Sequence, residues 1–242
     1  MLARFGIASR RGVVSLIEEG KVTVNGAVIR EKGFRVDASK DKVVVSGEEL
    51  AVQAPLVKRY FMLNKPKGVM TTLQDPHAER TVADFFADIP ERLFPVGRLD
   101  RDTTGLILMT NDGELAFRLT HPRFGVLKKY AVRVKGAVTE AAAKGLEAGI
   151  LLEEGKTAPC KIQIKSRKPG ETELAVALHE GKKRQIRRIF DKIGHRVLQL
   201  ERLSYGPLSL RDLRFGQKRE LTPREVRQLE ETAGIISSQR AR

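Results

Sequence analysis

Residues 97–113, GRLDRDTTGLILMTNDG, place one carboxylate between two arginines. Asp100 lies between Arg98 and Arg101, and neighbouring guanidinium groups favour the ionised form of a carboxylate. A Thr-Thr-Gly turn and then an apolar strand over 106–110 are predicted to follow. An ionised carboxylate that a turn holds in place could act as a nucleophile or stabilise developing positive charge. An isolated Arg-x-Asp triplet would indicate only a surface ion pair, because such pairs are common.

A second stretch, residues 179–202, is rich in basic side chains. It holds eight Lys or Arg residues and three acids, a net charge of +5 by count. On the helix predicted over 182–193, Arg184, Arg187 and Arg188 share one side, because three- and four-residue steps stack on a face. A basic amphipathic helix is usually only a solvated surface helix, so this pattern alone does not identify a site.

A third group, Lys128-Lys129-Tyr130, opens a segment in which apolar and polar residues alternate over 128–136. Strict alternation predicts a half-buried strand. On such a strand Tyr130 faces inward, and an inward-facing tyrosine most often has a structural role.

The 242-residue chain is strongly basic, with 45 Lys and Arg against 30 Asp and Glu and a formal net charge of +15. A surplus of this size indicates a polyanionic partner, either nucleic acid or an anionic membrane. We find no apolar run of about 18 residues and no signal-peptide pattern. Nucleic acid is therefore the favoured partner. The chain has a single cysteine, Cys160, and its four histidines show no metal-ligand spacing. A cytoplasmic location is therefore expected.

The elements that must position these groups predict an α+β fold in two domains. A small domain over 1–51 carries a helix capped by Ser9 and an Asn25-Gly26 hairpin signal. Residues 52–57 read as a linker, and 58–242 form the second domain. Its predicted strands lie over 128–136, 160–166 and 172–179, and its helices over 114–119, 139–148, 182–193 and 223–232.

Taken together, these segments resemble the pseudouridine synthases, in the branch that includes RsuA, RluB, RluE and RluF. Residues 97–113 fill every fixed position of the pattern G-R-L-D-x-x-T-x-G-L-[LI]-[LI]-x-T-N-D-G. Residues 128–130 match K-x-Y, and residues 184–188 match R-Q-[IV]-[RK]-R. The resemblance runs from about Ala3 to Arg227. The strings EGKKRQIRRIF and YGPLSL are more similar to the RluB-type large-subunit enzymes than to the RsuA type.

The small domain resembles the alpha-L RNA-binding motif, which a small-subunit ribosomal protein and several RNA-modifying enzymes share. The matching string is ASRRGVVSLIEEGKVTVNG, residues 8–26. The resemblance implies that Arg10, Arg11 and Lys21 contact an RNA backbone, which positions the protein without reading sequence. The sequence departs from the family at one point: family members usually carry several more residues ahead of Met1, so either the sequence starts late or the first helix is abbreviated.

For the second domain, the resemblance implies a large mixed, mainly antiparallel sheet with peripheral helices and a central basic cleft. Asp100 would lie near the anomeric carbon, Tyr130 would stack on the target uracil and remove its C5 proton, and Arg187 would pair with Asp100. The remaining basic residues expected to bind RNA are Lys65, Lys67, Arg98, Lys128, Lys182, Lys183, Arg184 and Arg188. The isomerisation needs no redox change and no energy source, so no cofactor or metal is expected.

The implied partner is ribosomal RNA or a ribosomal subunit precursor, with no membrane, and the chain is expected to be a monomer. Other classes remain open. One is a non-catalytic RNA-binding or ribosome-assembly protein. Another is a DNA-binding regulator, although no convincing helix-turn-helix is present. A third is a glycosidase that uses Asp100 and Asp102 as paired carboxylates. The chain is poor in the aromatic platforms of sugar sites, with 10 Phe, 3 Tyr and no Trp, so we expect Asp102 to face solvent or RNA.

Overall fold

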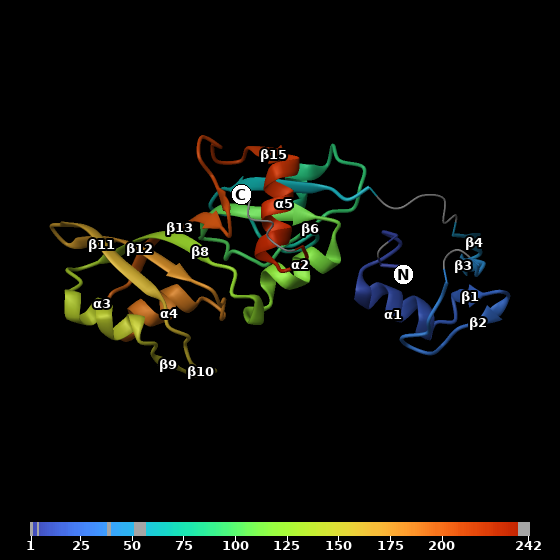
Figure 1. Ribbon diagram of the computed structural model, residues 1–242, viewed down its shortest axis with the longest axis horizontal. Helices are drawn as coiled ribbons and strands as arrows, with labels where there is room; N and C mark the ends of the chain where they lie inside the picture. Colours follow the sequence, from blue (N-terminus) through green and yellow to red (C-terminus); the bar gives the residue numbers. More distant parts are fainter. Residues whose placement is uncertain (1, 4, 38–39, 51–56, 237–242) are drawn as a thin grey trace. The chain divides into compact units, whose positions relative to one another are not determined.

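Two units, residues 1–58 and 59–242, each have their own set of internal contacts in the computed structural model of the chain (Figure 1). The structure describes residues 2–3, 5–37, 40–50 and 57–236, apart from the side chain of Arg10. The linker predicted over 52–57 lies outside the described residues except for its last position, and so does the end of the chain from residue 237.

The N-terminal unit packs one helix on a four-stranded sheet. Helix α1 (Arg10–Glu18) begins at Ser9, whose hydroxyl accepts a hydrogen bond from the Gly12 amide at 3.0 Å. The sheet has the order β2-β1-β3-β4, with β1 (Val22–Val24), β2 (Ala27–Val28), β3 (Val43–Val45) and β4 (Glu48–Glu49). The first hairpin turns at Asn25 and Gly26, which both have positive φ, as a type I′ turn requires. Both the helix cap and the hairpin were predicted from the sequence.

The second unit is built on one large sheet with the order β11-β12-β8-β13-β7-β5-β15 and two short strands attached to it. Its strands are β5 (Tyr60–Lys65), β6 (Phe94–Pro95), β7 (Thr104–Thr110), β8 (Lys128–Lys135), β11 (Lys161–Lys168), β12 (Glu171–Leu178), β13 (Val197–Tyr205), β14 (Leu208–Ser209) and β15 (Lys218–Glu220). Strands β7 and β13 run parallel, and the other pairings in this sheet are antiparallel. The predicted α+β fold, with a mixed and mainly antiparallel sheet, is confirmed.

Helices cover both faces of this sheet, because alternate residues of its central strands point to opposite sides. Ile107 and Met109 of β7 join one core, to which α3 (Glu140–Glu147) and α4 (Gln185–Lys192) contribute. Leu106 and Leu108 join the other core, with α2 (Gly113–Thr120) and α5 (Pro223–Thr232). Two short 3₁₀ helices, η1 (Ala83–Phe86) and η2 (Pro122–Phe124), and the hairpin of β9 (Leu151–Leu152) and β10 (Gly155–Lys156) complete the unit.

The start of β7 differs from the prediction in a way that matters for Asp100. The sequence predicts a Thr-Thr-Gly turn, and this prediction is wrong. The chain turns earlier, where the Thr103 amide donates to the Asp100 carbonyl at 3.0 Å. Thr104 and Gly105 already belong to β7 and pair with Glu201 and Arg202 of β13. Asp100 therefore lies at the turn itself, immediately before a central strand.

Candidate active site

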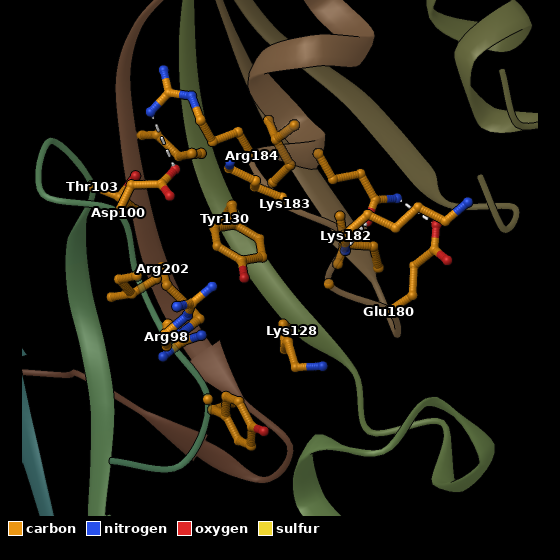
Figure 2. Close-up of a pocket in the computed structure, with 18 of the residues that line it drawn as sticks. Arg98, Asp100, Thr103, Lys128, Tyr130, Glu180, Lys182, Lys183, Arg184 and Arg202 are labelled. Carbon is orange, nitrogen blue, oxygen red and sulfur yellow. Dashed lines mark hydrogen bonds and ion pairs between the residues drawn. The ribbon is translucent and has the colours of Figure 1, made fainter. Parts of the chain in front are cut away.

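A pocket of about 510 Å³ opens where β8 and β13 meet the loop that precedes β7 (Figure 2). Strand β8 contributes Lys128 and Tyr130, β13 contributes Arg202, and the loop contributes Arg98 and Asp100. The other lining residues are Gly97, Leu99, Thr103, Thr120, Pro122, Leu178, Glu180, Gly181, Lys182, Lys183, Arg184, Gln185, Ile186, Leu200 and Tyr205. The three stretches that carry candidate chemistry in the sequence thus converge on one cavity.

The loop that carries Asp100 is held by hydrogen bonds to the end of β5 and to the segment that follows it. The Thr71 hydroxyl donates to the Leu99 carbonyl at 2.7 Å and accepts from the Leu99 amide at 3.2 Å. The Arg101 carbonyl accepts from the Gly68 amide at 2.9 Å and from the Lys65 ammonium at 3.3 Å. Contacts on both sides of Asp100 therefore hold its backbone in place.

The guanidinium of Arg184 reaches the Asp100 carboxylate, with Nη1 3.6 Å from Oδ2 (Figure 2). Arg184 immediately precedes α4 and has a left-handed backbone, with φ at +50°. The two side chains are 46% and 34% exposed, so water screens the attraction between them. The ion pair therefore orients the carboxylate more than it stabilises the fold.

Arg187 was predicted to pair with Asp100, but the structure pairs Asp100 with Arg184 instead. The side chain of Arg187 is buried, and Nη2 donates to the Asp102 carbonyl at 3.3 Å and to the Thr103 hydroxyl at 3.4 Å. Nη1 donates to the Val197 carbonyl at 3.4 Å. Burial lowers the pKa of Arg187 and the nearby Arg184 adds to this effect, while Asp100 and Asp102 oppose it. Arg187 thus joins the Asp100 turn to β13. The charge of Asp100 acts on the Arg187 guanidinium, although the two side chains form no ion pair.

The reason lies in where α4 begins. The predicted helix starts near residue 182, whereas the observed one starts at Gln185. The left-handed backbone of Arg184 turns its side chain towards Asp100, and Arg187 points under the turn instead. Arg188 points away from both and pairs with Glu153 and Glu154. The three arginines expected on one side of a helix therefore have three different sets of partners.

Tyr130 lies on β8 with its ring in the pocket and is 8% exposed (Figure 2). The neighbouring strand places Arg202 directly opposite it in the sheet register. No hydrogen bond of the Tyr130 hydroxyl is found among the described residues. The ring can therefore present both a flat face and a phenolic oxygen to a planar group in the pocket.

Two buried cationic side chains, Lys128 and Arg202, lie over the ring of Tyr205 in the same pocket as Tyr130. The Arg202 guanidinium carbon lies 5.0 Å from the centre of this ring and the Lys128 Nζ 5.4 Å from it. Arg202 donates through Nε to the Leu106 carbonyl at 2.6 Å, and its buried Nη2 has no hydrogen-bond partner among the described residues. Burial, helped by the charge of Arg202, lowers the pKa of Lys128 to about 8. This part of the pocket favours negative charge on whatever binds there.

The family model described as RNA pseudouridylate synthase matches residues 59–192. This range contains Asp100 and Tyr130 together with Arg184 and Arg187. The chain belongs to the RNA pseudouridylate synthase family. A second model, the S4 domain, matches residues 1–43 of this synthase. The predicted combination of a pseudouridine synthase with a small N-terminal RNA-binding motif is therefore confirmed.

Relatives and a solved structure agree with this assignment over nearly the full chain. The synthase is 46% identical to "Ribosomal large subunit pseudouridine synthase B" of Bacillus subtilis (strain 168), over 95% of this chain and 93% of that protein. It is 42% identical to an uncharacterized RNA pseudouridine synthase of Aquifex aeolicus (strain VF5), over 97% and 93%. A crystal structure of a pseudouridylate synthase superposes with a TM-score of 0.68 at 30% identity, covering 94% of this chain and 96% of that one.

The basic residues predicted to bind RNA in the synthase differ in how accessible they are. Lys67, Arg98, Lys183 and Arg184 are exposed, whereas the Lys182 ammonium donates to the carbonyls of Gly155 and Lys156. In the N-terminal unit Arg11 is exposed and Lys21 pairs with Glu19; the side chain of Arg10 lies outside the described residues.

The prediction that Lys65 binds RNA is contradicted by its burial. Its side chain is 0% exposed, and its ammonium donates to the carbonyls of Pro66, Val69 and Arg101. Burial lowers the pKa of Lys65 to about 8. Lys65 therefore supports the Asp100 loop from inside the protein, and only Lys67 of this basic turn faces solvent.

The sequence also left pocket residues unnamed, above all Arg202, Glu180 and Gln185. The signal for Arg202 was present, since it ends the basic stretch at 179–202, but no strand was predicted there. Asp102, the rival carboxylate, is exposed and does not line the pocket. The arrangement does not support a paired-carboxylate glycosidase site.

Within the described part of the chain, no group of three or more His, Cys, Asp or Glu side chains is placed to hold a metal ion. No helix of that part combines the length and the apolar character needed to cross a membrane.

Proposed function

We propose that this synthase converts a specific uridine of large-subunit ribosomal RNA to pseudouridine, with Asp100 as the catalytic carboxylate. The observation that carries the proposal is the position of Asp100, at a fixed turn on the edge of a cationic pocket and within 3.6 Å of Arg184. The printed name of the Bacillus subtilis relative supports large-subunit RNA as the substrate. The RluB-like strings at 180–190 and 205–210 point the same way.

Binding would require that the target base leave its stack, because Asp100 and Tyr130 both line the pocket and must reach the sugar and the base of one nucleotide. Exposed cations at the pocket edge, Arg98, Lys183 and Arg184, would contact the phosphates on either side of the displaced nucleotide. Contacts of this kind hold the strand and carry no sequence information. The formal net charge of +15 favours this association and makes it sensitive to salt.

In the first step the bond between N1 of the uracil and C1′ of the ribose breaks, and its electron pair stays on the uracil. Asp100 either bonds to C1′ or assists loss of the C2′ proton to give a glycal. Arg184 keeps the carboxylate oriented towards the sugar. Lys128 and Arg202, buried against Tyr205, would stabilise the negative charge that the released uracil carries.

In the second step the uracil turns while it stays in the pocket, and C5 bonds to the same sugar carbon. This bond displaces Asp100 from C1′ in the adduct route, and in the glycal route it forms as a proton returns to C2′. The ring of Tyr130 provides a face on which the base can stack while it turns. C5 then carries an extra proton, and Tyr130 is the proposed base that removes it. The reaction is an isomerisation without net redox change, so we propose that it uses no cofactor. We also expect a monomer in the cytoplasm that acts on ribosomal RNA or a ribosomal subunit precursor.

Pseudouridine mapping on purified large- and small-subunit ribosomal RNA, each incubated with the protein, tests this proposal. We expect one new pseudouridine in the large-subunit RNA. A new site in small-subunit RNA alone would contradict the proposed substrate and keep the chemistry. The absence of any new site on naked RNA and on subunit precursors would favour a ribosome-assembly protein that only binds RNA.

A further inference from the structure

An exposed cluster of aromatic rings lies where α2 ends and η2 begins. Phe117, His121 and Phe124 form this aromatic rim, with ring centres 5.2 Å apart for Phe117 and His121 and 6.2 Å apart for the other two pairs. Phe124 is partly buried against the core beneath α2, which anchors the rim. Phe117 is 50% exposed. Several rings gathered at one place on the surface are typical of a binding site, whereas a single exposed ring is not.

Two arginines accompany the rim. The Arg123 guanidinium carbon lies 4.5 Å from the centre of the Phe124 ring and 5.7 Å from that of Phe117, and Arg118 lies 5.5 Å from Phe124. Arg118 is occupied by Glu114 and by the Gly234 carbonyl. Arg123 is exposed and has no acidic partner among the described residues. The rim therefore offers flat rings together with an uncompensated positive charge.

The aromatic rim is continuous with the pocket of Asp100. Thr120 and Pro122, which lie between Phe117 and Phe124 in the chain, line that pocket. The last turn of α2 is tied to the pocket floor, because the Tyr205 hydroxyl donates to the Leu119 carbonyl at 2.8 Å. A strand that delivers one nucleotide to Asp100 would pass over this part of the surface.

We propose that the aromatic rim is a stacking platform for an unpaired base next to the target uridine, with Arg123 facing the adjoining phosphate. This inference rests on the proposed function, because it takes RNA as the substrate of the pocket. Displacing the target base from its stack leaves its neighbours without a partner on one side. Aromatic rings accept any base in stacking, and arginine adds attraction for both the base and the phosphate. Charge and continuity with the pocket favour RNA over a protein partner.

The test compares Phe117→Ala with a matched control, Phe215→Ala, in the full-length protein. Phe215 is 56% exposed in the same unit, and it does not line the pocket. The probe is a short single-stranded RNA with one uridine and 2-aminopurine beside it, whose fluorescence falls when the analogue stacks on an aromatic ring. The dissociation constant is measured at fixed salt, and pseudouridine formation on ribosomal RNA is measured in parallel.

We expect the wild-type protein to quench 2-aminopurine, and Phe117→Ala to remove the quenching and weaken binding about tenfold. Phe215→Ala should match the wild type. On ribosomal RNA, Phe117→Ala should raise KM and leave kcat nearly unchanged. The platform is refuted if Phe117→Ala binds like the wild type, if both variants weaken binding equally, or if the wild type does not quench. A change in sedimentation on Phe117→Ala without a change in RNA affinity would point to a second copy and refute it too.

Failure of the proposed function has a different signature. Quenching that depends on Phe117 without pseudouridine in any ribosomal RNA would remove the enzymatic proposal and keep the platform. Pseudouridine formation with equal KM for Phe117→Ala and the wild type would refute the platform and keep the enzymatic proposal.

Discussion

The backbone of Gly105 lies directly against that of Arg202, where β7 and β13 run parallel. A Cβ added to Gly105 would come within 2.3 Å of the Arg202 carbonyl oxygen, and the φ of Gly105 is +107°. This close approach joins the strand that follows the Asp100 turn to the strand that carries the buried pocket arginine. The geometry of the pocket therefore depends on the absence of a side chain at one position.

Gly105→Ala should destabilise the second unit by at least about 2 kcal/mol, since it combines a backbone clash with a strained φ. Urea unfolding measures this loss. Gly113→Ala is the matched control, because nothing lies within 4 Å of its added Cβ and Gly113 is the first residue of α2. Equal stability of the two variants would contradict the close contact between β7 and β13.

Arg184 and Arg187 should respond differently to replacement by methionine. Arg184→Met removes an exposed partner of Asp100, so we expect kcat to fall by about tenfold or more with unchanged stability. Arg187→Met leaves three oxygen acceptors without their donor, so it should also cost about 1–3 kcal/mol of unfolding free energy. Arg184→Lys, which keeps the charge, should recover part of the activity. If Arg187→Met were as stable as Arg184→Met, the buried contacts of Arg187 would not be those described here.

Tyr130→Phe tests the role of Tyr130 as general base without disturbing the fold. The ring and its packing remain, and among the described residues no hydrogen bond of the hydroxyl is lost. The free energy of unfolding should therefore change by less than about 0.5 kcal/mol. Release of tritium from RNA labelled at C5 of uridine should slow by a factor of about 10²–10⁴, the usual contribution of a general base. Tritium release at the wild-type rate would assign the base to another group of the pocket.

The stability of the protein should depend on pH through Lys128. Its pKa is about 8 in the folded chain against an ordinary value of 10.5, so between these values the unfolded chain binds more protons. The Lys128 contribution therefore disfavours folding below pH 8, and this penalty disappears as the pH rises towards 10.5. We expect Lys128→Met to unfold with about 1–3 kcal/mol more free energy at pH 7 and with a smaller advantage at pH 10. Lys129→Met, on the exposed neighbour, should show neither effect; an advantage of Lys128→Met that is independent of pH would contradict the burial of the charged amine.

Local signals in the sequence predict many elements but not the contacts that complete the pocket. The helix predicted over 223–232 has the observed bounds of α5, because proline follows the capping residue Thr222 and marks the first position of a helix. Strand β13 was missed because register shifts between Val197 and Gln199 and between Arg202 and Ser204 break the two-residue alternation. Arg202 was therefore not recognised as a pocket residue.

The candidate site shows the same division. The sequence brings Asp100, Tyr130 and the arginine cluster together through resemblance, and the structure places all three stretches around one pocket. Which arginine touches Asp100 depends on the left-handed backbone of Arg184, which has no signature in residue type. The burial of Lys65 depends on the carbonyls of three other positions, and a basic turn looks the same whether or not its lysines are exposed.

The most direct test of the central claim is tritium release from C5-labelled large-subunit ribosomal RNA by the wild type, Asp100→Asn and Asp102→Asn. Asp102 is the control, since it is exposed and lies outside the pocket. We predict full release by the wild type, release within a few-fold of it by Asp102→Asn, and none by a correctly folded Asp100→Asn that still binds the RNA. Release by Asp100→Asn at a rate near that of the wild type would contradict the catalytic role of Asp100 and with it the proposed mechanism.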